Sequence, residues 1–502
     1  MTSAELVRFE RLLEQLVRLV DTFRWIVDAQ CIEFFSRDLW EKLPRSWQLS
    51  LTNVTYTELA LILQGRQSSR WIGPLSLLAL VKAVCALSLP RQIVDVKTIV
   101  RTVEKAHATA DTQPDSHKIS SEEIVTHSFS RHVKPKKLHE IEHLGQLVSG
   151  LCERKGVDRV LDVGCGQGHL SRLLAYRYGL NVSGIEAIGR HIDEAQSLDQ
   201  CILIDKNKQE RRQQETTSPK LMKEQKFSSG KLQYITCEIS PTICPKEFIS
   251  CLDRCQAIQS HSGRLPSAVQ QSQSNKNPFF LTGLHTCGDL GPTILKLFAC
   301  CHEAQLLALV SCCYMKMEHL DCSDEDEARE INYGYSYPLS SSLRKLPAHH
   351  LSYRAKELAC HNIDGYCQRL KANDTTLKLH CYRAAVQCLL NKKFPGCAHK
   401  NIRTIRRGGQ LGITEYAKQA LMKIGLPADL TPEDVQLLES LIKYEVHAVA
   451  FYCLHLMFGP IVETILLLDR LLFLKEQGLS ASVLPLFESS QSPRCHVIVC
   501  SK

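Results

Sequence analysis

The chain lacks the sequence features that mark exported and zinc-finger proteins. It opens MTSAELVRFERLLEQL, with no apolar signal core and no small-residue cleavage site. It has 23 cysteines, but no CxxC motif pairs with another CxxC or with HxxxH at the spacing of a zinc site. We therefore expect a reduced, intracellular protein, cytoplasmic or nuclear, whose cysteines act mainly as small apolar side chains and which needs no metal.

The chain is also short of long hydrophobic runs. The only run long enough to cross a bilayer is 446–468, and it is interrupted by His447, His455, Pro460 and Glu463. The run continues into the charged segment DRLLFLKEQG, which is typical of a buried helix end. A buried helix over 446–478 is therefore favoured over a membrane span.

Extremes of composition are absent as well. Of the 502 residues, 44% are hydrophobic, 23% are charged and 7% are aromatic, which excludes collagen, a coiled coil and general disorder. The length suggests two or three structural units. A formal net charge of +8 permits an anionic partner without requiring one.

The hydrophobic pattern changes along the chain. Residues 1–108 have apolar positions at helical spacing and predict an N-terminal helical domain, and 109–125 predict a polar linker. From 126 to 502, short β-rich runs alternate with helical stretches, which predicts an α/β domain with a parallel sheet. The expected strands are 159–164, 180–186, 231–237, 279–285 and 306–312, followed by a hairpin formed by SASVLPLFE and RCHVIVCSK.

Three insertions are expected in this α/β domain. Charge and Gln dominate 205–231, and Gln and Ser are frequent in 256–278, so both are predicted to be disordered surface insertions. A mostly helical insertion is expected over about 320–445. The hairpin after it would complete a sheet of seven strands.

The strongest local signal is VLDVGCGQG, residues 160–168, in which a strand enters a glycine turn ahead of a helix. The NAD fingerprint fails here, because His169 occupies the third glycine position and an aspartate precedes the first glycine. The spacing D-x-G-x-G-x-G instead suits a ligand without a pyrophosphate and with a cationic amino-acid end, as in S-adenosylmethionine. A degenerate loop without a ligand is the alternative. The expected cofactor residues are Asp162, Gly164, Cys165, Gly166, Gly168 and Glu186.

Two of these residues have specific expected roles. Asp162 would orient the cationic end of the cofactor, directly or through the loop amides. Glu186 closes the next strand, where an acidic side chain can accept both ribose hydroxyls. Upstream of the loop, Lys137 and His139 lie in a segment that would either fold over the cofactor carboxylate or simply begin a solvated helix.

Four sequence blocks carry a resemblance to a known family. KPKKLHEIEHL, VLDVGCGQGHLSRLL, LTGLHTCGDLG and VSCCYMKM resemble the methyltransferase-like protein 25 family. The resemblance implies a seven-stranded class I (Rossmann-like) methyltransferase fold that uses S-adenosylmethionine, without a defined substrate. The HTCG and SCCY blocks are also similar to those of eukaryotic tRNA 2'-O-methyltransferases, although Tyr314 stands where that family favours His.

Catalytic candidates follow the fourth and fifth expected strands. His285 is a candidate general base or substrate partner, or a histidine that pins its loop. Asp289 would contact substrate or cap the next helix. Cys312 and Cys313 are candidate nucleophiles for cytosine-5 methylation, or buried thiols. The chain reads LHTCGDL where adenine amino-group methyltransferases carry N-[LP]-P-[YF], so methylation of adenine is not predicted.

One segment is basic and lacks acidic residues altogether. Residues 375–414 contain eight Lys or Arg and no Asp or Glu, which is typical of a stretch that contacts phosphates, or of a solvated basic loop. The residues proposed to contact RNA are Lys392, Lys393, Arg403, Arg406 and Arg407. We therefore expect a methyltransferase whose acceptor is RNA, with a protein acceptor and a non-catalytic binding scaffold as alternatives.

Overall fold

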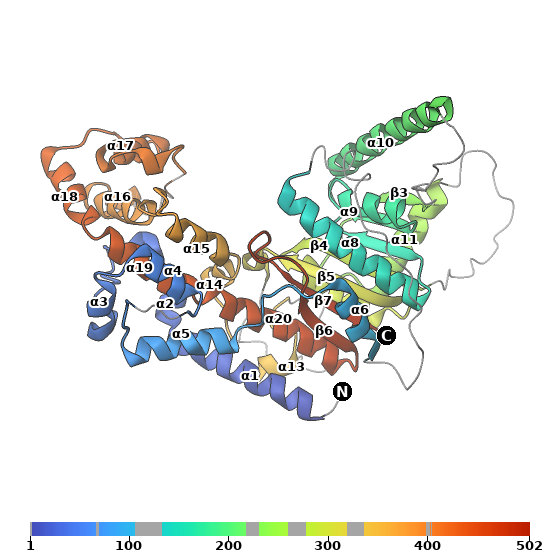
Figure 1. The fold of residues 1–502 in the computed structure, drawn as a ribbon, viewed down its shortest axis with the longest axis horizontal. Coiled ribbons are helices and arrows are strands. Elements are labelled where there is room, and N and C mark those ends of the chain that lie inside the picture. Colours follow the sequence, from blue (N-terminus) through green and yellow to red (C-terminus); the bar gives the residue numbers. More distant parts are fainter. Residues whose placement is uncertain are drawn as a thin grey trace. The chain divides into compact units, whose positions relative to one another are not determined.

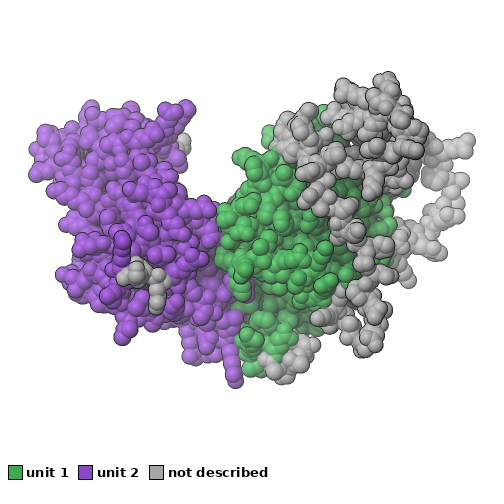
Figure 2. All heavy atoms as spheres, in the orientation of Figure 1, with its two compact units in different colours: residues 1–10, 90–347, 466–502 green, residues 11–89, 348–465 purple. Residues whose placement is uncertain are grey.

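The computed structural model describes residues 3–66, 70–105, 133–216, 230–259, 278–318, 336–397, 402 and 404–502. The chain divides into two compact units, each built from segments distant in sequence (Figure 2). Unit 1 comprises residues 1–10, 90–347 and 466–502, and unit 2 comprises residues 11–89 and 348–465.

This division differs from the expected boundaries. Residues 1–108 were expected to fold as a separate domain, and about 320–445 as an insertion into another one. Most of both segments instead combine in unit 2. The physical reason is that their helices cover one another, as where α4 (Tyr56–Leu63) packs against α15 (Ile363–Lys371).

Unit 1 contains a mixed sheet of seven strands in the order β3-β2-β1-β4-β5-β7-β6 (Figure 1). Strands β1 to β5 are parallel, and β7 runs antiparallel to both β5 and β6. The strands are β1 Arg159–Val163, β2 Asn181–Glu186, β3 Leu232–Thr236, β4 Phe279–Cys287, β5 Ala304–Cys312, β6 Ser480–Pro485 and β7 His496–Ser501. The seven strands expected from the sequence are confirmed.

Buried apolar side chains hold helices against this sheet. Val160 on β1, Phe280 on β4 and Ala308 on β5 form one cluster with Leu144 on α8 and Ile99 on α6. Strands buried on both faces read as continuous apolar runs, which explains why they were recognisable in the sequence. The helical elements of unit 1 are α6 Val96–Lys105, α8 Pro135–Lys155, α9 His169–Arg172, the π-helical turn η2 Leu173–Arg177, α10 Gly189–Thr216, α11 Pro245–Gln259, α12 Leu290–Cys300, η3 Tyr314–Lys316 and α13 Ser341–Arg344.

The regular secondary-structure elements in the described residues of unit 2 are all helices. Its elements are α2 Arg24–Val27, η1 Cys31–Glu33, α3 Arg45–Leu51, α4, α5 Leu75–Leu87, α14 Tyr353–Leu358, α15, α16 Leu379–Lys393, η4 Pro395–Cys397, η5 Gly408–Gln410, α17 Ile413–Lys423, α18 Pro432–Ile442 and α19 Glu445–Leu456. Two further helices, α1 (Ser3–Thr22) and α20 (Gly459–Glu476), contribute residues to both units.

The apolar run near the C-terminus is two helices rather than one. The continuous helix expected over 446–478 is interrupted at Met457 and Phe458, where α19 ends and α20 has not yet begun. Within the described ranges, Glu445–Glu476 is the only stretch long and apolar enough to cross a membrane, and 89% of its most apolar window is buried. Burial of this degree is typical of core helices.

The expected disordered insertions correspond only in part to the structure. Residues 205–216 are helical and extend α10, so the prediction of disorder from 205 is wrong there, and α11 likewise continues to Gln259. A charged, Gln-rich sequence also suits a helix, because Lys, Arg, Glu and Gln all favour helix formation, which explains the error. The rest of both insertions and the expected linker 109–125 lie outside the described residues.

Candidate functional site

The glycine loop follows β1 and leads into α9 at the carboxyl end of the sheet. Gly164, Gly166 and Gly168 all have positive φ values, 75°, 55° and 70°, which favour glycine at each position. The amides of Gly164 and Cys165 both donate to the Ile185 carbonyl of β2, at 2.8 and 3.1 Å. A Cβ atom added at Gly166 would meet nothing within 4 Å, so the loop is open at that point.

Glu186, the last residue of β2, holds the same loop. One carboxylate oxygen accepts from the Gly166 amide at 3.0 Å, and the other accepts from the Ile188 amide at 3.1 Å. His191 lies 3.4 Å from the second oxygen. A carboxylate has about four acceptor positions, so this one keeps capacity for a further donor at the strand end.

Asp162 lies beneath the loop rather than at its surface. Its side chain is only 1% exposed and accepts from the Ser171 hydroxyl of α9 at 2.6 Å. Burial raises the pKa of Asp162 to about 6, although the hydrogen bonds from Ser171 lower it. The Asp162 carboxylate can therefore act on a ligand only through the loop and through its own electric field. Its negative charge is poorly compensated within the protein.

The remaining loop side chains pack inward. Cys165 contacts a small apolar cluster with Ile192 and Tyr234, and burial raises the pKa of its thiol. Arg172 is buried and donates to Asp199 at 3.0 Å and to the Gln167 carbonyl at 2.7 Å. Cys165 thus contributes to the site through its backbone, not through its sulfur.

The helix before β1 carries two charged residues to the site. On α8, Lys137 and Glu140 are three residues apart and share one face. Burial lowers the pKa of Lys137, and the nearby Arg172 lowers it further, whereas the charges of Glu140 and Asp162 raise it. Lys137 therefore lies within electrostatic range of the Asp162 carboxylate beneath the loop.

Glu140 is the most constrained acid of the site. It is 1% exposed, lies 2.8 Å from His285 Nε2, and accepts from the Ser492 hydroxyl at 2.5 Å. Burial raises the pKa of Glu140, but the hydrogen bonds from His285 and Ser492 and the nearby positive charge outweigh this and hold the pKa below its usual value. The buried carboxylate thus fixes the imidazole of His285.

The backbone of His285 also has an unusual conformation. His285 has a φ of 64°, in the left-handed region that non-glycine residues seldom adopt. The register between β4 and β5 shifts between Leu284 and Thr286, so His285 is the extra residue of a β-bulge. The side chain remains 33% exposed, so the bulge turns a partly accessible imidazole toward Glu140.

His139 lies near the start of α8 and contacts the segment after β6. Its Nε2 atom accepts from the Glu488 amide at 3.0 Å, and its ring lies 4.1 Å from that of His143. Burial lowers the pKa of His139, and the neighbouring His143 lowers it further. These contacts are with α8 and the segment after β6, so they give His139 a packing role in the described structure.

Asp289 ties two loops together instead of capping a helix with its side chain. It is the residue before α12, but its side chain makes no capping hydrogen bond there. One of its oxygens accepts from the Glu318 amide at 2.9 Å. Gly288, with a φ of 56°, lies so close to Lys316 that an added Cβ would be 2.9 Å from its carbonyl oxygen. The segments after β4 and β5 are thus joined.

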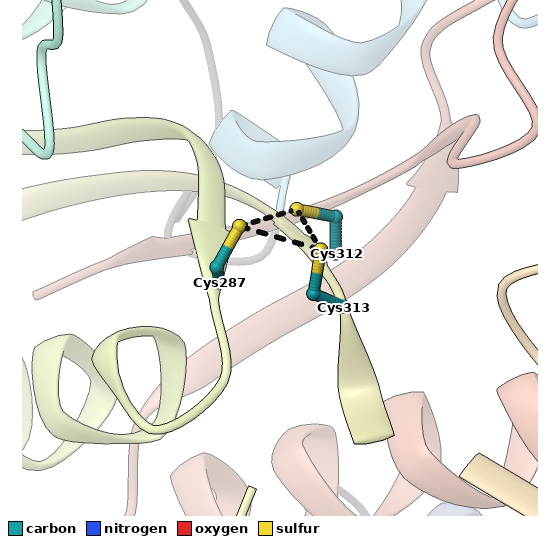
Figure 3. Close-up of side chains that lie close together, drawn as sticks. All are labelled: Cys287, Cys312 and Cys313. Carbon is teal, nitrogen blue, oxygen red and sulfur yellow. Dashed lines mark hydrogen bonds between the residues drawn. The ribbon is translucent and has the colours of Figure 1, made fainter. Parts of the chain in front are cut away.

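Three thiols meet where β4 and β5 end (Figure 3). Cys287 Sγ lies 3.0 Å from Cys312 Sγ and 3.5 Å from Cys313 Sγ, and the last two are 3.6 Å apart. The hydrogen bond with Cys312 lowers the pKa of Cys287 to about 6, with smaller contributions from His285 and Lys316. The same pairing raises the pKa of Cys312.

The basic residues expected to contact RNA belong to unit 2. Lys392, Arg406 and Arg407 are exposed, whereas Lys393 is half-buried and donates to Asp434 at 2.5 Å and to the Asp429 carbonyl at 2.8 Å. Arg403 lies outside the described residues. Lys393 therefore stabilises the start of α18.

The sequence alone assigns no role to Glu140, Ser492 or Cys287, although Cys287 is expected with His285 and Asp289 at the end of the fourth strand. Glu140 stands in the block KPKKLHEIEHL, where an acid in the middle of an apolar helix face signals a buried partner. Cys287 stands in HTCG, two residues after His285. No local signal identifies Ser492, because its partner lies 352 residues away.

Comparison with known proteins agrees with this geometry. Residues 136–320 match a family model described as a methyltransferase domain, and this range includes the loop, Glu140, His285 and all three thiols. The chain contains a methyltransferase domain. The human protein named "Probable methyltransferase-like protein 25" is 24% identical over 459 residues, which cover 73% of this chain and 74% of that protein. The mouse protein of the same name is 23% identical over 465 residues, covering 73% and 75%. No solved structure matches the chain significantly.

These matches support the resemblance to the methyltransferase-like protein 25 family. They extend well beyond the four blocks that first suggested it, since they cover 73% of the chain. They also support transfer of a methyl group as the activity of the domain.

The ionisation of Asp162 yields a prediction about stability. Its folded pKa of about 6 exceeds the ordinary value of 3.8, so above pH 6 its charge opposes folding, and below pH 3.8 this cost is absent. We expect Asp162→Asn to raise the free energy of unfolding at pH 7.5 by up to about 3 kcal/mol, because each pKa unit is worth about 1.4 kcal/mol. The gain should shrink as the pH falls from 6 to 4.

Chemical unfolding at a series of pH values measures this effect. The matched control is Asp193→Asn, because Asp193 is exposed, and its pH profile should follow that of the wild type. A variant at Asp162 that is less stable than wild type at pH 7.5 would show that the buried charge does not oppose folding.

Proposed function

We propose that this chain is a class I methyltransferase that uses S-adenosylmethionine as methyl donor. The observation that carries the proposal is the glycine loop with three positive φ values, above a buried carboxylate whose charge opposes folding. A buried charge that lowers stability, at the edge of a sheet where ligands commonly bind, is typical of a functional residue. The strand order 3-2-1-4-5-7-6 with its antiparallel seventh strand supports the class I, Rossmann-like assignment.

The residues of the loop suit this cofactor. The surface at Gly166 is open, so an amino-acid end can approach the backbone closely, and the amide there faces the Glu186 carboxylate. Asp162 supplies a negative field for a cationic ligand. Glu186 offers an acceptor for ribose hydroxyls at the end of β2. The bound cofactor would supply an electrophilic methyl group, and the protein would position the acceptor against it.

His285 is the candidate general base. Glu140 accepts a hydrogen bond from His285 Nε2–H, which leaves Nδ1 as the nitrogen that can take a proton from the acceptor. A base held by a buried acid is the arrangement that orients an imidazole in many enzymes. Lys137 and Glu140 on one face of α8 link this pair to the carboxylate beneath the loop.

RNA is the acceptor that we propose. The acid-free segment 375–414 and the exposed side chains of Lys392, Arg406 and Arg407 favour a phosphate-bearing partner. A protein acceptor and a non-catalytic binding scaffold are the alternatives. We further propose that the chain corresponds to the 25B member of the family, because its four sequence blocks resemble that member.

The loop can be tested with a matched pair of variants. Gly166 and Gly156 both have positive φ, 55° and 65°, and neither leaves a Cβ atom anything to meet within 4 Å. We therefore expect Gly166→Ala and Gly156→Ala to lose similar stability, about 1 to 2 kcal/mol. Only Gly166→Ala should lower affinity for S-adenosylmethionine. We expect a loss of at least about tenfold, which corresponds to about 1.4 kcal/mol of binding free energy.

Ligand-induced thermal shifts of both variants measure the difference. Gly156 ends α8 and does not belong to the loop, so it controls for the strain of a left-handed alanine. Equal affinity in the two variants would remove the loop from the cofactor site.

The imidazole–carboxylate pair makes a second prediction. We expect His285→Ala to reduce transfer of labelled methyl groups into cell RNA by about 10²- to 10⁴-fold, the usual contribution of a general base. Glu140→Gln should reduce it less. The double variant should be no slower than His285→Ala alone, because the two residues act as a unit.

Affinity for S-adenosylhomocysteine serves as the control, and it should change little in all three variants. If the losses of the two single variants multiply in the double variant, Glu140 does not act through His285. If affinity falls in parallel with turnover, His285 supports the cofactor site instead of the transfer step.

A further inference from the structure

The three thiols at the ends of β4 and β5 form a cluster that the transfer step does not use. Cys287 and Cys312 are paired residues of neighbouring parallel strands, and Cys313 follows directly. Their sulfur atoms lie 3.0, 3.5 and 3.6 Å apart, so they occupy the corners of a small triangle (Figure 3). Cys287 is exposed, so the triangle is accessible to solvent.

These separations are close to those around a tetrahedral zinc ion. A Zn–S distance of about 2.3 Å places neighbouring sulfur ligands about 3.8 Å apart. Two of the three separations, 3.5 and 3.6 Å, differ little from this value, and the third needs an expansion of less than about 1 Å. Among the described residues, no fourth His, Cys or carboxylate joins the group. Zinc sites with three protein ligands leave the fourth position to water or another ligand.

The surrounding backbone fixes the position of the thiols. Thr286 and Ser311, the residues preceding Cys287 and Cys312, have their hydroxyls 3.2 Å apart. Beyond the cluster, Asp289 accepts from the Glu318 amide, and Gly288 packs against Lys316. Cys313 has a left-handed φ of 50°, a conformation that costs a non-glycine residue free energy and that the neighbouring contacts maintain. Such preorganisation is typical of metal sites.

The local charges also suit a bound cation with three thiolates. Three thiolates and one Zn²⁺ carry a net charge of −1. Lys316 lies within electrostatic range of Cys287, so positive charge is available to compensate. Binding would release the thiol protons to solvent.

We propose that Cys287, Cys312 and Cys313 bind one Zn²⁺ ion at the carboxyl ends of β4 and β5. The site is distinct from the glycine loop, and it does not depend on the use of S-adenosylmethionine. A disulfide is the competing use of such thiols, but it would engage two of the three sulfurs and would need an oxidant. A cluster of three, in a chain whose described cysteines are all free thiols, favours the metal.

Metal content of the full-length chain tests the proposal. We expect about one zinc per chain by plasma mass spectrometry after dialysis against metal-free buffer, and loss of that zinc in Cys287→Ser, Cys312→Ser and Cys313→Ser. Cys85→Ser is the matched control, because Cys85 is an exposed cysteine outside the cluster, and it should retain the zinc. Cobalt added to the metal-free wild type should give the charge-transfer absorption of thiolate ligation, and zinc should displace it.

The wild type alone also provides a test that does not need a folded variant. Removal of zinc by a chelator should lower its melting temperature, and addition of zinc should restore it. Zinc retained by all three cluster variants would overturn the proposal. So would a metal-free wild type without cobalt absorption, or a Cys287–Cys312 disulfide found by peptide mapping of the protein isolated without reductant. None of these outcomes bears on binding of S-adenosylmethionine.

Discussion

The buried carboxylate of Glu140 is the contact on which the arrangement of the site depends. It joins three segments of unit 1 that are far apart in the sequence: α8, the bulge of β4 and the segment between β6 and β7. A carboxylate that is 1% exposed needs hydrogen-bond donors within the protein, and His285 and Ser492 supply one to each oxygen. The position of the imidazole therefore follows from the burial of the acid. Lys137, on the same face of α8, extends the network to Asp162 beneath the glycine loop.

Two non-glycine residues at the carboxyl edge of the sheet have left-handed backbones. His285 lies in the bulge near the end of β4, and Cys313 follows β5 directly. Each such residue costs about 1 to 3 kcal/mol, so the fold maintains them against local preference. The bulge at His285 aims its ring, and the turn at Cys313 brings a third sulfur to the cluster. Strain of this kind is common at functional sites.

The sheet could be predicted because its signals are local. Leu306 to Val310 read as a buried apolar run, and Val160 to Val163 read as one that only Asp162 interrupts. The spacing of Gly164, Gly166 and Gly168 identifies a ligand loop without any knowledge of the fold. The division into units could not be predicted, because it depends on which helices cover one another, such as α4 and α15.

The partners of Glu140 and the cysteine cluster could not be predicted from the sequence either, because both join distant segments. The partners of Glu140 lie 145 and 352 residues away, and Cys287 lies 25 residues before Cys312, on a different strand. Zinc motifs are recognised by short spacing, so a site assembled across neighbouring strands is not visible in the sequence. For the same reason, the sequence does not predict that Asp289 contacts Glu318 or that His139 contacts Glu488.

The role that we propose for the glycine loop of this methyltransferase domain is to bind S-adenosylmethionine. Calorimetric titration of the purified full-length chain with S-adenosylmethionine, S-adenosylhomocysteine and NAD⁺ tests it most directly, because the loop resembles a dinucleotide site in its glycines but lacks the third one. We expect one binding site per chain for each of the first two ligands and no heat with NAD⁺. Binding of NAD⁺, or no heat with either sulfur compound in folded protein, would contradict it.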